Sequence, residues 1–321
     1  MNSFTLGEAR QQGLFLLVQE EKTSKNCSER LRTHLLDVDC ILCYVAGVSK
    51  TYIFSHPEAI ITEEQYKQFL DLIEKRKKGF PVAYLIEKKE FFGYDFFVSP
   101  DVLIPKPDTE ILVEKALELV KKITLEKQIE LEKEKDFCSS EKNSLKIADI
   151  CTGSGCVAIS VAKKLQELNN VNFKMVATDI CEKALNVAKR NCRQNDCNVE
   201  FLLGDLLEPL IIKNQSFDLI ISNPPYVPKT VAKELLLDGR SEPILALDGD
   251  CGETCDGTGI IRRLVGQLDK VLKKGGYVII EAGEYNIETV QEILKDNGFI
   301  QVEIFKDLSG MNRVIMGKKE K

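Results

Sequence analysis

Apolar residues recur every three to four positions along most of the first 78 residues, which is the spacing of amphipathic helices. Gly47 and Ser55-His56-Pro57 interrupt this pattern. Thr62, followed three positions later by Gln65, is typical of a helix that begins with a capping box. We therefore expect residues 1–78 to form a small helical domain.

The pattern changes at Pro81. Residues 82–86 and 90–98 are rich in aromatic and β-branched side chains, and Gly93 lies inside the second segment. These two segments predict a β-hairpin that occupies residues 79–104 and links two domains. Pro105-Lys106-Pro107 then ends the extended structure, and an amphipathic pattern predicts a helix from Asp108 to about Val120.

From residue 145 onward, apolar strand-like runs alternate with helical patterns. This alternation indicates an α/β domain over residues 105–321, with a mostly parallel sheet covered by helices on both faces. The predicted strands are 146–150, 174–179, 199–203, 217–222, 277–281, 299–305 and 312–316, and the predicted helices include 158–167, 181–191 and 260–272. The last two strands are too close for a crossover helix, so they should pair antiparallel at the sheet edge.

Residues 121–144 are a lysine- and glutamate-rich stretch of low complexity inside this domain. Such a charged run is usually a solvated face. We interpret it as a helical extension or a mobile insertion in preference to a binding surface.

Composition and charge restrict the function classes. The formal net charge of -6 argues against broad nucleic-acid binding, which depends on basic side chains that neutralise phosphates. The sequence contains no run of 18 apolar residues, so we predict no membrane-spanning helix. Met1-Asn2-Ser3-Phe4 does not resemble the start of a secretory signal. The eleven cysteines, an odd number, fit reduced thiols better than a disulfide framework. We therefore expect a cytoplasmic protein.

Cys40 and Cys43 have the spacing of a zinc or redox pair. They lie in a mostly apolar run, where cysteine behaves as a small buried apolar residue. The chain has only two histidines, His34 and His56, and no second close cysteine pair to complete a four-ligand site. We therefore expect no metal.

A glycine-rich loop follows the first strand of the α/β domain, and Gly153, Gly155 and Ala158 have the spacing of a dinucleotide-binding loop. Glycines allow a tight turn and close approach to a ligand, with a helix N-terminus behind them. The next strand ends in Asp179, whose carboxylate could accept both ribose hydroxyls of an adenosyl group or cap the following helix. NAD and S-adenosylmethionine fit this pattern equally well.

Asn223-Pro224-Pro225-Tyr226 directly follows the predicted strand 217–222. The two prolines keep the segment extended and remove two backbone N–H groups. The Pro224 carbonyl and the Asn223 side-chain oxygen are then two neighbouring acceptors that can hold both hydrogens of one –NH2 group. Tyr226 offers a flat face for stacking a planar amide or base. A plain turn is the alternative interpretation.

This arrangement suits methyl transfer to a planar nitrogen, which is a poor nucleophile because its lone pair is delocalised. Holding both hydrogens directs the lone pair at the methyl donor, so catalysis rests mainly on proximity and orientation. No strong general base is needed, which agrees with the shortage of histidine. The segment therefore favours S-adenosyl-L-methionine as the cofactor and an amide or amine nitrogen as the acceptor.

Further segments give a resemblance to a known family, the protein-(glutamine-N5) methyltransferases that act on peptide-chain release factors. Residues 76–85 and 90–93 resemble the family's linker, 102–110 its pre-catalytic motif and 149–155 its cofactor loop. Segments 217–228, 242–247 and 306–314 also correspond, so most of the chain from about residue 30 is covered.

The resemblance implies a class I, Rossmann-like methyltransferase domain and an N-terminal helical domain that helps to recognise the release factor. The substrate would be the glutamine of the factor's Gly-Gly-Gln loop, held by Asn223, Pro224, Pro225 and Tyr226. The implied cofactor residues are Cys151, Thr152, Gly153, Ser154, Gly155, Asp179, Asp205, Leu206 and Asn223. No metal, membrane or specific nucleic-acid partner is implied.

The chain departs from the family pattern at four places. Cys151 replaces a first glycine, at a point that we expect to precede the tight turn, and Lys106 replaces an arginine. The lysine keeps the charge but loses bidentate geometry, so it is not expected to replace an arginine that pairs with a carboxylate through two bonds. Asn286 stands where glutamine is expected, and the loop 248–259 is a few residues longer than usual.

Two other classes of function remain open from the residues themselves. An adenine-N6 or related nucleic-acid methyltransferase could use the same tetrapeptide, but a basic recognition domain would then be expected. A non-catalytic scaffold or an NAD enzyme would not need Asn223 to Tyr226, and no acid/base pair for hydride transfer is evident.

Overall fold

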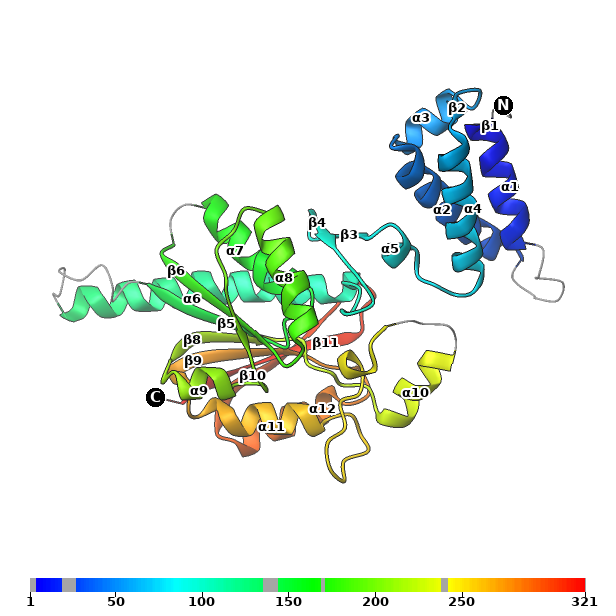
Figure 1. Ribbon diagram of the computed structural model, residues 1–321. Coiled ribbons are helices and arrows are strands. Elements are labelled where there is room, and N and C mark those ends of the chain that lie inside the picture. The colour runs from blue at the N-terminus through cyan, green and yellow to red at the C-terminus, as the bar shows by residue number, and fades with distance from the viewer. Residues whose placement is uncertain (1–3, 19–26, 135–143, 169–170, 238–241, 321) are drawn as a thin grey trace. The chain divides into compact units, whose positions relative to one another are not determined.

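The computed structural model describes residues 4–18, 27–134, 144–168, 171–237 and 242–320 (Figure 1). The chain divides into two compact units, Met1–Lys88 with Leu235–Ser241, and Lys89–Glu234 with Glu242–Lys321. Each unit has its own apolar core. No helix among these described ranges is long and apolar enough to cross a membrane.

The N-terminal unit is built from helices, as predicted. They are α1 (Leu6–Val18), α2 (Cys27–Ala46), α3 (Lys50–Ser55) and α4 (Glu63–Lys77), and the two-residue strands β1 (Phe4–Thr5) and β2 (Ile60–Ile61) pair antiparallel. The predicted capping box is confirmed, because the Gln65 N–H donates to Thr62 Oγ1 at 3.1 Å and the Thr62 N–H donates to Gln65 Oε1 at 2.9 Å. Helices α1 and α4 pack closely, since a Cβ on Gly13 would lie 2.6 Å from Phe69 Cζ.

Cys40 and Cys43 both lie on α2, but the expectation that they are buried is wrong. Cys40 is exposed and Cys43 is half-buried. Their neighbours Ile41 and Leu42 are the residues that enter the core. The two cysteines therefore flank the apolar stripe of α2 and contribute less to it than their sequence context suggests.

The predicted first strand of the linker, residues 82–86, is also wrong. These residues form a short helix, α5 (Val82–Leu85), which follows Pro81 and buries Tyr84 and Leu85. The hairpin lies further along the chain, as β3 (Lys88–Phe91) and β4 (Tyr94–Phe97). Its turn contains Phe92 and Gly93, both with positive φ.

The larger unit contains a seven-stranded sheet in the order β10-β11-β9-β8-β5-β6-β7. Strands β5 (Leu145–Ile150), β6 (Phe173–Asp179), β7 (Glu200–Leu203), β8 (Phe217–Ser222) and β9 (Leu272–Glu281) are parallel. The predicted antiparallel pair is confirmed as β10 (Phe299–Lys306) and β11 (Asn312–Lys319). The later strand, β11, inserts between β9 and β10 and leaves β10 at the edge.

Helices cover both faces of this sheet (Figure 1). On one face, α6 (Glu110–Glu134), α7 (Cys156–Leu168) and α8 (Glu182–Gln194) contribute to an apolar core with the sheet. On the other face lie α9 (Glu208–Ile212), α11 (Gly259–Leu268) and α12 (Ile287–Asp296). Helix α10 (Lys229–Leu237) follows the Asn223–Tyr226 segment. The sheet is therefore buried on both sides, as its apolar strands predict.

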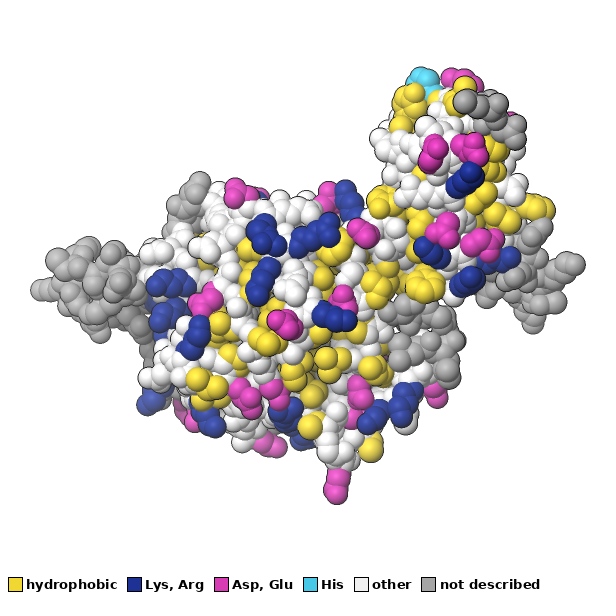
Figure 2. Space-filling model, in the orientation of Figure 1, with side chains coloured by type: hydrophobic (Ala, Val, Ile, Leu, Met, Phe, Trp, Pro, Cys, Tyr) yellow, Lys and Arg dark blue, Asp and Glu magenta, His cyan; other side chains and the backbone are white. Residues whose placement is uncertain are grey.

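The charged stretch begins as a continuation of α6, which runs 14 residues beyond its predicted end at Val120, to Glu134. Lys127 pairs with Asp218 at 2.9 Å, and Glu126 accepts hydrogen bonds from Lys318 and Tyr277. The part of α6 around Lys127 is thus joined to the sheet by polar contacts, and it is also partly exposed to solvent. Residues 135–143 lie outside the described residues. Figure 2 shows basic and acidic side chains interspersed over one face of the larger unit.

Candidate active site

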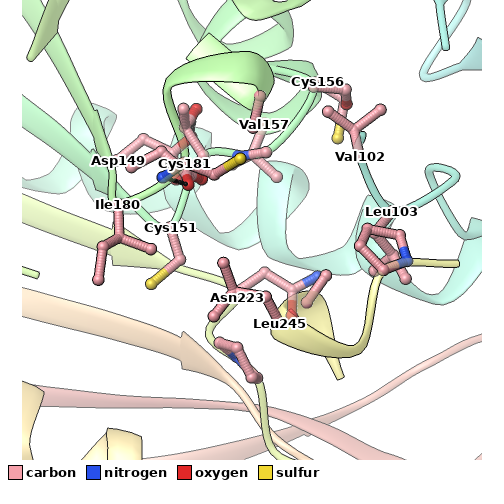
Figure 3. Close-up of a pocket in the computed structure, with 18 of the residues that line it drawn as sticks. Val102, Leu103, Asp149, Cys151, Cys156, Val157, Ile180, Cys181, Asn223 and Leu245 are labelled. Carbon is pink, nitrogen blue, oxygen red and sulfur yellow. Dashed lines mark hydrogen bonds between the residues drawn. The ribbon is translucent and has the colours of Figure 1, made fainter. Parts of the chain in front are cut away.

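The larger unit contains a cavity of about 300 Å³ at the carboxyl ends of its central parallel strands (Figure 3). The chain leaves β5 toward β6 on one side and returns as β8 on the other, so the loops after these strands diverge there. Ligands of open α/β sheets bind at such a reversal of strand order. The walls come from the loops after β5, β6, β7 and β8, and from the segments around Val102 and Leu245.

The loop between β5 and α7 forms one wall, and its backbone explains its glycines. Cys151, Gly153 and Gly155 all have positive φ, at 61°, 54° and 80°. Cys151 comes directly before the tight turn Thr152–Gly155, as expected, because the Gly155 N–H closes that turn on the Thr152 carbonyl at 2.8 Å. Cys151 nevertheless has a left-handed φ itself, which is the conformation that favours glycine. A Cβ on Gly155 would lie 2.9 Å from Ile159 Cδ1, whereas a Cβ on Gly153 would enter open space. Thr152, Gly153 and Ser154 line the cavity with Cys151.

Asp179 holds this loop from the end of β6. Its Oδ2 accepts the Gly153 N–H at 2.8 Å, and its Oδ1 accepts the Cys181 N–H at 2.9 Å near the start of α8. Burial raises the pKa of the carboxyl, and the backbone donors oppose that shift. Each oxygen keeps acceptor capacity beyond its one backbone bond. Asp179 therefore anchors the loop and the helix start while it faces the cavity.

Asp205 and Leu206 follow β7 and also line the cavity. The Asp205 carboxylate pairs with Arg263, a cavity residue from α11. Leu206 has a φ of 51°, and its carbonyl accepts the Thr178 hydroxyl at 2.9 Å. This hydrogen bond thus holds Leu206, another residue of the site with a left-handed φ, next to β6.

The four residues of the Asn223–Tyr226 segment lie in different environments. Asn223 and Pro225 line the cavity, and Pro224 is buried. The Asn223 Nδ2 donates to Thr109 Oγ1 at 3.3 Å, which leaves Oδ1 without a protein donor among the residues that the structure describes. Tyr226 is not one of the described cavity-lining residues. Its ring packs against the core beneath the sheet, and its hydroxyl donates to Glu281 Oε1 at 3.1 Å.

The long loop 248–259 supports the end of this segment. The Val227 N–H donates to the Leu247 carbonyl, and the Gly249 N–H donates back to the Val227 carbonyl, both at 2.9 Å. A Cβ on Gly257 would lie 2.2 Å from the Tyr226 carbonyl oxygen. The loop therefore lies directly against the backbone of the tetrapeptide, a contact that the sequence interpretation did not include.

Comparison with known proteins gives the family. A methyltransferase domain model matches residues 141–317, and a PrmC N-terminal domain model matches residues 23–86. A release factor glutamine methyltransferase of Clostridium acetobutylicum is 37% identical over 88% of this chain and 90% of its own length. Those of Clostridium botulinum and Bacillus subtilis are 33% and 34% identical, over 95% and 86% of this chain and 98% and 88% of their own lengths. This chain belongs to the release factor glutamine methyltransferase family.

Membership of this family confirms the resemblance expected from the motifs, together with a class I methyltransferase fold and dependence on S-adenosylmethionine. The structure also resolves two departures from the family pattern. Lys106 pairs with the buried Glu242 at 2.6 Å, so the single lysine donor is sufficient to form the ion pair. Asn286 is buried and donates from Nδ2 to the Tyr226 carbonyl at 2.9 Å, so the shorter amide still reaches the tetrapeptide.

Three polar residues near the site were not found from the sequence. Thr109 contacts Asn223, and Glu281 contacts Tyr226. Asn191, fully buried on α8, donates from Nδ2 to the carbonyls of Ser154 and Phe97, each at 2.9 Å. A polar residue on an otherwise apolar helix face or at the end of an apolar strand is a signal for such roles, because buried polar groups need partners.

Proposed function

We propose that this methyltransferase transfers the methyl group of S-adenosylmethionine to the side-chain amide nitrogen of the glutamine in the Gly-Gly-Gln loop of peptide-chain release factors. The observation that carries the proposal is Asn223, whose Nδ2 is occupied by Thr109 and whose Oδ1 is left to accept a hydrogen from a substrate amide. The proposal includes a cytoplasmic location, which the free cysteines favour.

S-adenosylmethionine fits the donor set of the cavity. The open space beside Gly153 allows a ligand to approach the loop backbone, and Asp179 presents a largely buried carboxylate with acceptor capacity for two ribose hydroxyls. Cys151, Thr152, Ser154 and Gly155 would complete the loop around the cofactor. The segment Asp205-Leu206 and Asn223 would border it on the remaining sides. When bound, the cofactor supplies an electrophilic methyl group.

The chain's own contribution is to orient the glutamine amide. Asn223 Oδ1 and the Pro224 carbonyl would accept the two amide hydrogens, and Pro225 would form the adjoining wall. This arrangement restricts the nitrogen to one direction of attack, and effective molarity from such positioning contributes on the order of 7–11 kcal/mol in well-oriented reactions. Tyr226 would act through its backbone, since its ring packs against the core and its hydroxyl is already bonded to Glu281.

The helical N-terminal unit would help to recognise the release factor. It matches the N-terminal domain model over residues 23–86, and relatives named for release factor methylation cover nearly the whole chain, including this unit. The interspersed acidic and basic side chains in Figure 2 and the net charge of -6 do not favour nucleic acid as the substrate.

Labelling identifies the substrate. We expect purified protein and labelled S-adenosylmethionine to modify a purified release factor at the Gly-Gly-Gln glutamine, and mass spectrometry of the loop peptide to show one added methyl group. A factor with that glutamine changed to alanine is the matched control and should take up no label. Label on nucleic acid with none on the factor would instead support the adenine-N6 alternative.

Asp179→Asn should weaken binding of S-adenosylmethionine by roughly tenfold or more, because charge-assisted hydrogen bonds to the ribose become weaker and one acceptor becomes a donor. Calorimetric titration measures the dissociation constant, and thermal unfolding of the free protein separates this loss from damage to the loop. Asp101→Asn is the control, since Asp101 also lines the cavity but is half-exposed beside Lys183. Equal affinities for the Asp179 variant and the wild type would leave Asp179 with its anchoring role only.

A further inference from the structure

Two cysteines at the end of α8 lie side by side. Cys192 belongs to the last turn of the helix and is 7% exposed, and Cys197 follows five positions later and is half-buried. Their sulfur atoms are 3.3 Å apart. The Cys197 N–H donates to the Cys192 carbonyl at 3.2 Å, and the Cys192 thiol donates to the Cys197 carbonyl at 3.0 Å. These bonds hold the two thiols together in the reduced protein.

This arrangement suits a disulfide that forms and breaks. A disulfide bond is about 2.0 Å long, so the two sulfurs need to approach by only about 1.3 Å more. The closed ring would span residues 192–197, and so short a ring restricts the unfolded chain little. Such a bond adds little stability, which favours reversible use over a structural role. Neither cysteine is among the described residues that line the cofactor cavity, so methyl transfer leaves both thiols unused.

The cysteine turn, residues 192–197, adjoins the residue that ties α8 to the cofactor loop. Asn191 is fully buried, and its Nδ2 donates to the carbonyls of Ser154 in that loop and of Phe97 at the end of β4, each at 2.9 Å. Its Oδ1 accepts the Phe97 N–H at 2.7 Å. The carbonyl of Asn191 accepts the N–H of Asn195, which lies within the cysteine turn, at 3.0 Å. A shift of the turn therefore acts directly on the backbone of Asn191.

We propose that Cys192 and Cys197 are a redox-active pair that small-molecule disulfides oxidise, and that the resulting bond weakens binding of S-adenosylmethionine through Asn191. Oxidation removes the thiol hydrogen that bonds Cys192 to the Cys197 carbonyl, and it draws the two sulfurs together. The cysteine turn must then shift, which moves the Asn191 amide away from the Ser154 carbonyl. The proposal goes beyond the methylated substrate, since it holds for any acceptor of the methyl group.

The oxidation is a thiol–disulfide exchange in two steps. The thiolate of one cysteine attacks a sulfur of the external disulfide, forms a mixed disulfide and releases one small thiolate. The second cysteine then loses its proton, and its sulfur attacks the first cysteine sulfur and displaces the other small thiolate. The two cysteines are oxidised to one disulfide, and the external disulfide is reduced to two thiols that take up the two protons. In a reducing compartment such a bond is transient and responds to oxidants.

Peptide mapping tests the bond itself. Trypsin cleaves after arginine and lysine, so the two cysteines fall in separate peptides, 191–193 and 194–213. After incubation with oxidised glutathione and alkylation of the remaining thiols, we expect a species that joins these two peptides and separates on reduction. Cys192→Ser and Cys197→Ser are the matched controls and should not form it. A wild type whose two cysteines stay reduced, or carry only separate glutathione adducts, would overturn the proposal.

Calorimetry measures the consequence for the cofactor. The dissociation constant of S-adenosylmethionine should rise by roughly tenfold on oxidation, the effect of losing about one hydrogen bond, and reduction should restore it. The double variant Cys192→Ser/Cys197→Ser should bind as the reduced wild type does, with or without oxidant. An equal loss of affinity in the oxidised double variant would place the effect at another thiol, such as Cys181 in the cavity, and would overturn the link to Asn191.

Amide exchange with deuterium, followed by NMR, reports on Asn191 without cofactor or substrate. The Phe97 N–H, which donates to Asn191 Oδ1, should exchange about tenfold faster in the oxidised protein and return to its first rate on reduction. The Gln65 N–H, bonded to Thr62 in the N-terminal unit, is the internal control and should not change. Equal exchange of the Phe97 N–H in the two redox forms would contradict the path through Asn191.

Discussion

Replacing Asn223 with alanine should lower kcat by about 100- to 1000-fold, the range found when one positioned polar group is removed from the charge-developing part of an active site. The substitution removes the Oδ1 acceptor that we assign to the substrate amide and the Nδ2 donor that bonds Thr109. The affinity for S-adenosylmethionine should change by less than about threefold, because Asp179 and the loop around Gly153 remain intact. Single-turnover methylation of a release factor measures the rate, and calorimetry measures the cofactor affinity.

Asn297→Ala is the matched control for this change. Asn297 caps the end of α12 through its own side chain, which donates to the Ile293 carbonyl at 2.8 Å, and it is not one of the described cavity-lining residues. It should lose some stability and keep the wild-type rate. An Asn223→Ala variant that retains full activity would show that the amide clamp is wrong, whatever the substrate proves to be.

The sheet could be predicted from sequence because its strands are short apolar runs between helical patterns, and burial on both faces requires such runs. Residues 217–222, for example, form β8 within the predicted bounds and are buried throughout. The insertion of β11 between β9 and β10 could not be predicted, because pairing partners depend on contacts between distant segments. The error at residues 82–86 has a local reason: a run of five apolar residues fits a strand and one helical turn equally well.

In the candidate site, too, local features could be predicted from the sequence and long-range contacts could not. The turn-forming glycines, Asp179 and the tetrapeptide have local signatures, so their position at the strand ends was predictable. Thr109 and Glu281 have only the weak signal of a polar residue in apolar surroundings, and their partners could not be predicted, since each lies in a segment more than 50 positions away. Tyr226 was expected to present a stacking face, and the long-range bond of its hydroxyl to Glu281 was not foreseen for the same reason.

Replacing Gly257 with alanine should disrupt the site without touching the cavity. The added Cβ would lie 2.2 Å from the Tyr226 carbonyl oxygen and 3.0 Å from the Pro228 nitrogen, at a residue whose φ is 75°. Both neighbours are backbone atoms, so no side-chain rotation can relieve the contact, and the loop 248–259 must move away from the tetrapeptide. Such overpacking typically costs about 1–3 kcal/mol, and the shift should lower kcat by about 100-fold through misplacement of the clamp.

Gly252→Ala separates this contact from simple backbone strain. Gly252 lies in the same loop with a φ of 65°, but a Cβ there would meet nothing within 4 Å. It should lose about 1 kcal/mol in urea unfolding, the cost of placing a side chain in the left-handed region, and keep nearly the wild-type kcat. If both variants lost activity equally, backbone strain in the loop would explain the effect. If only Gly257→Ala does, close contact with the Tyr226 backbone is what the loop contributes to catalysis.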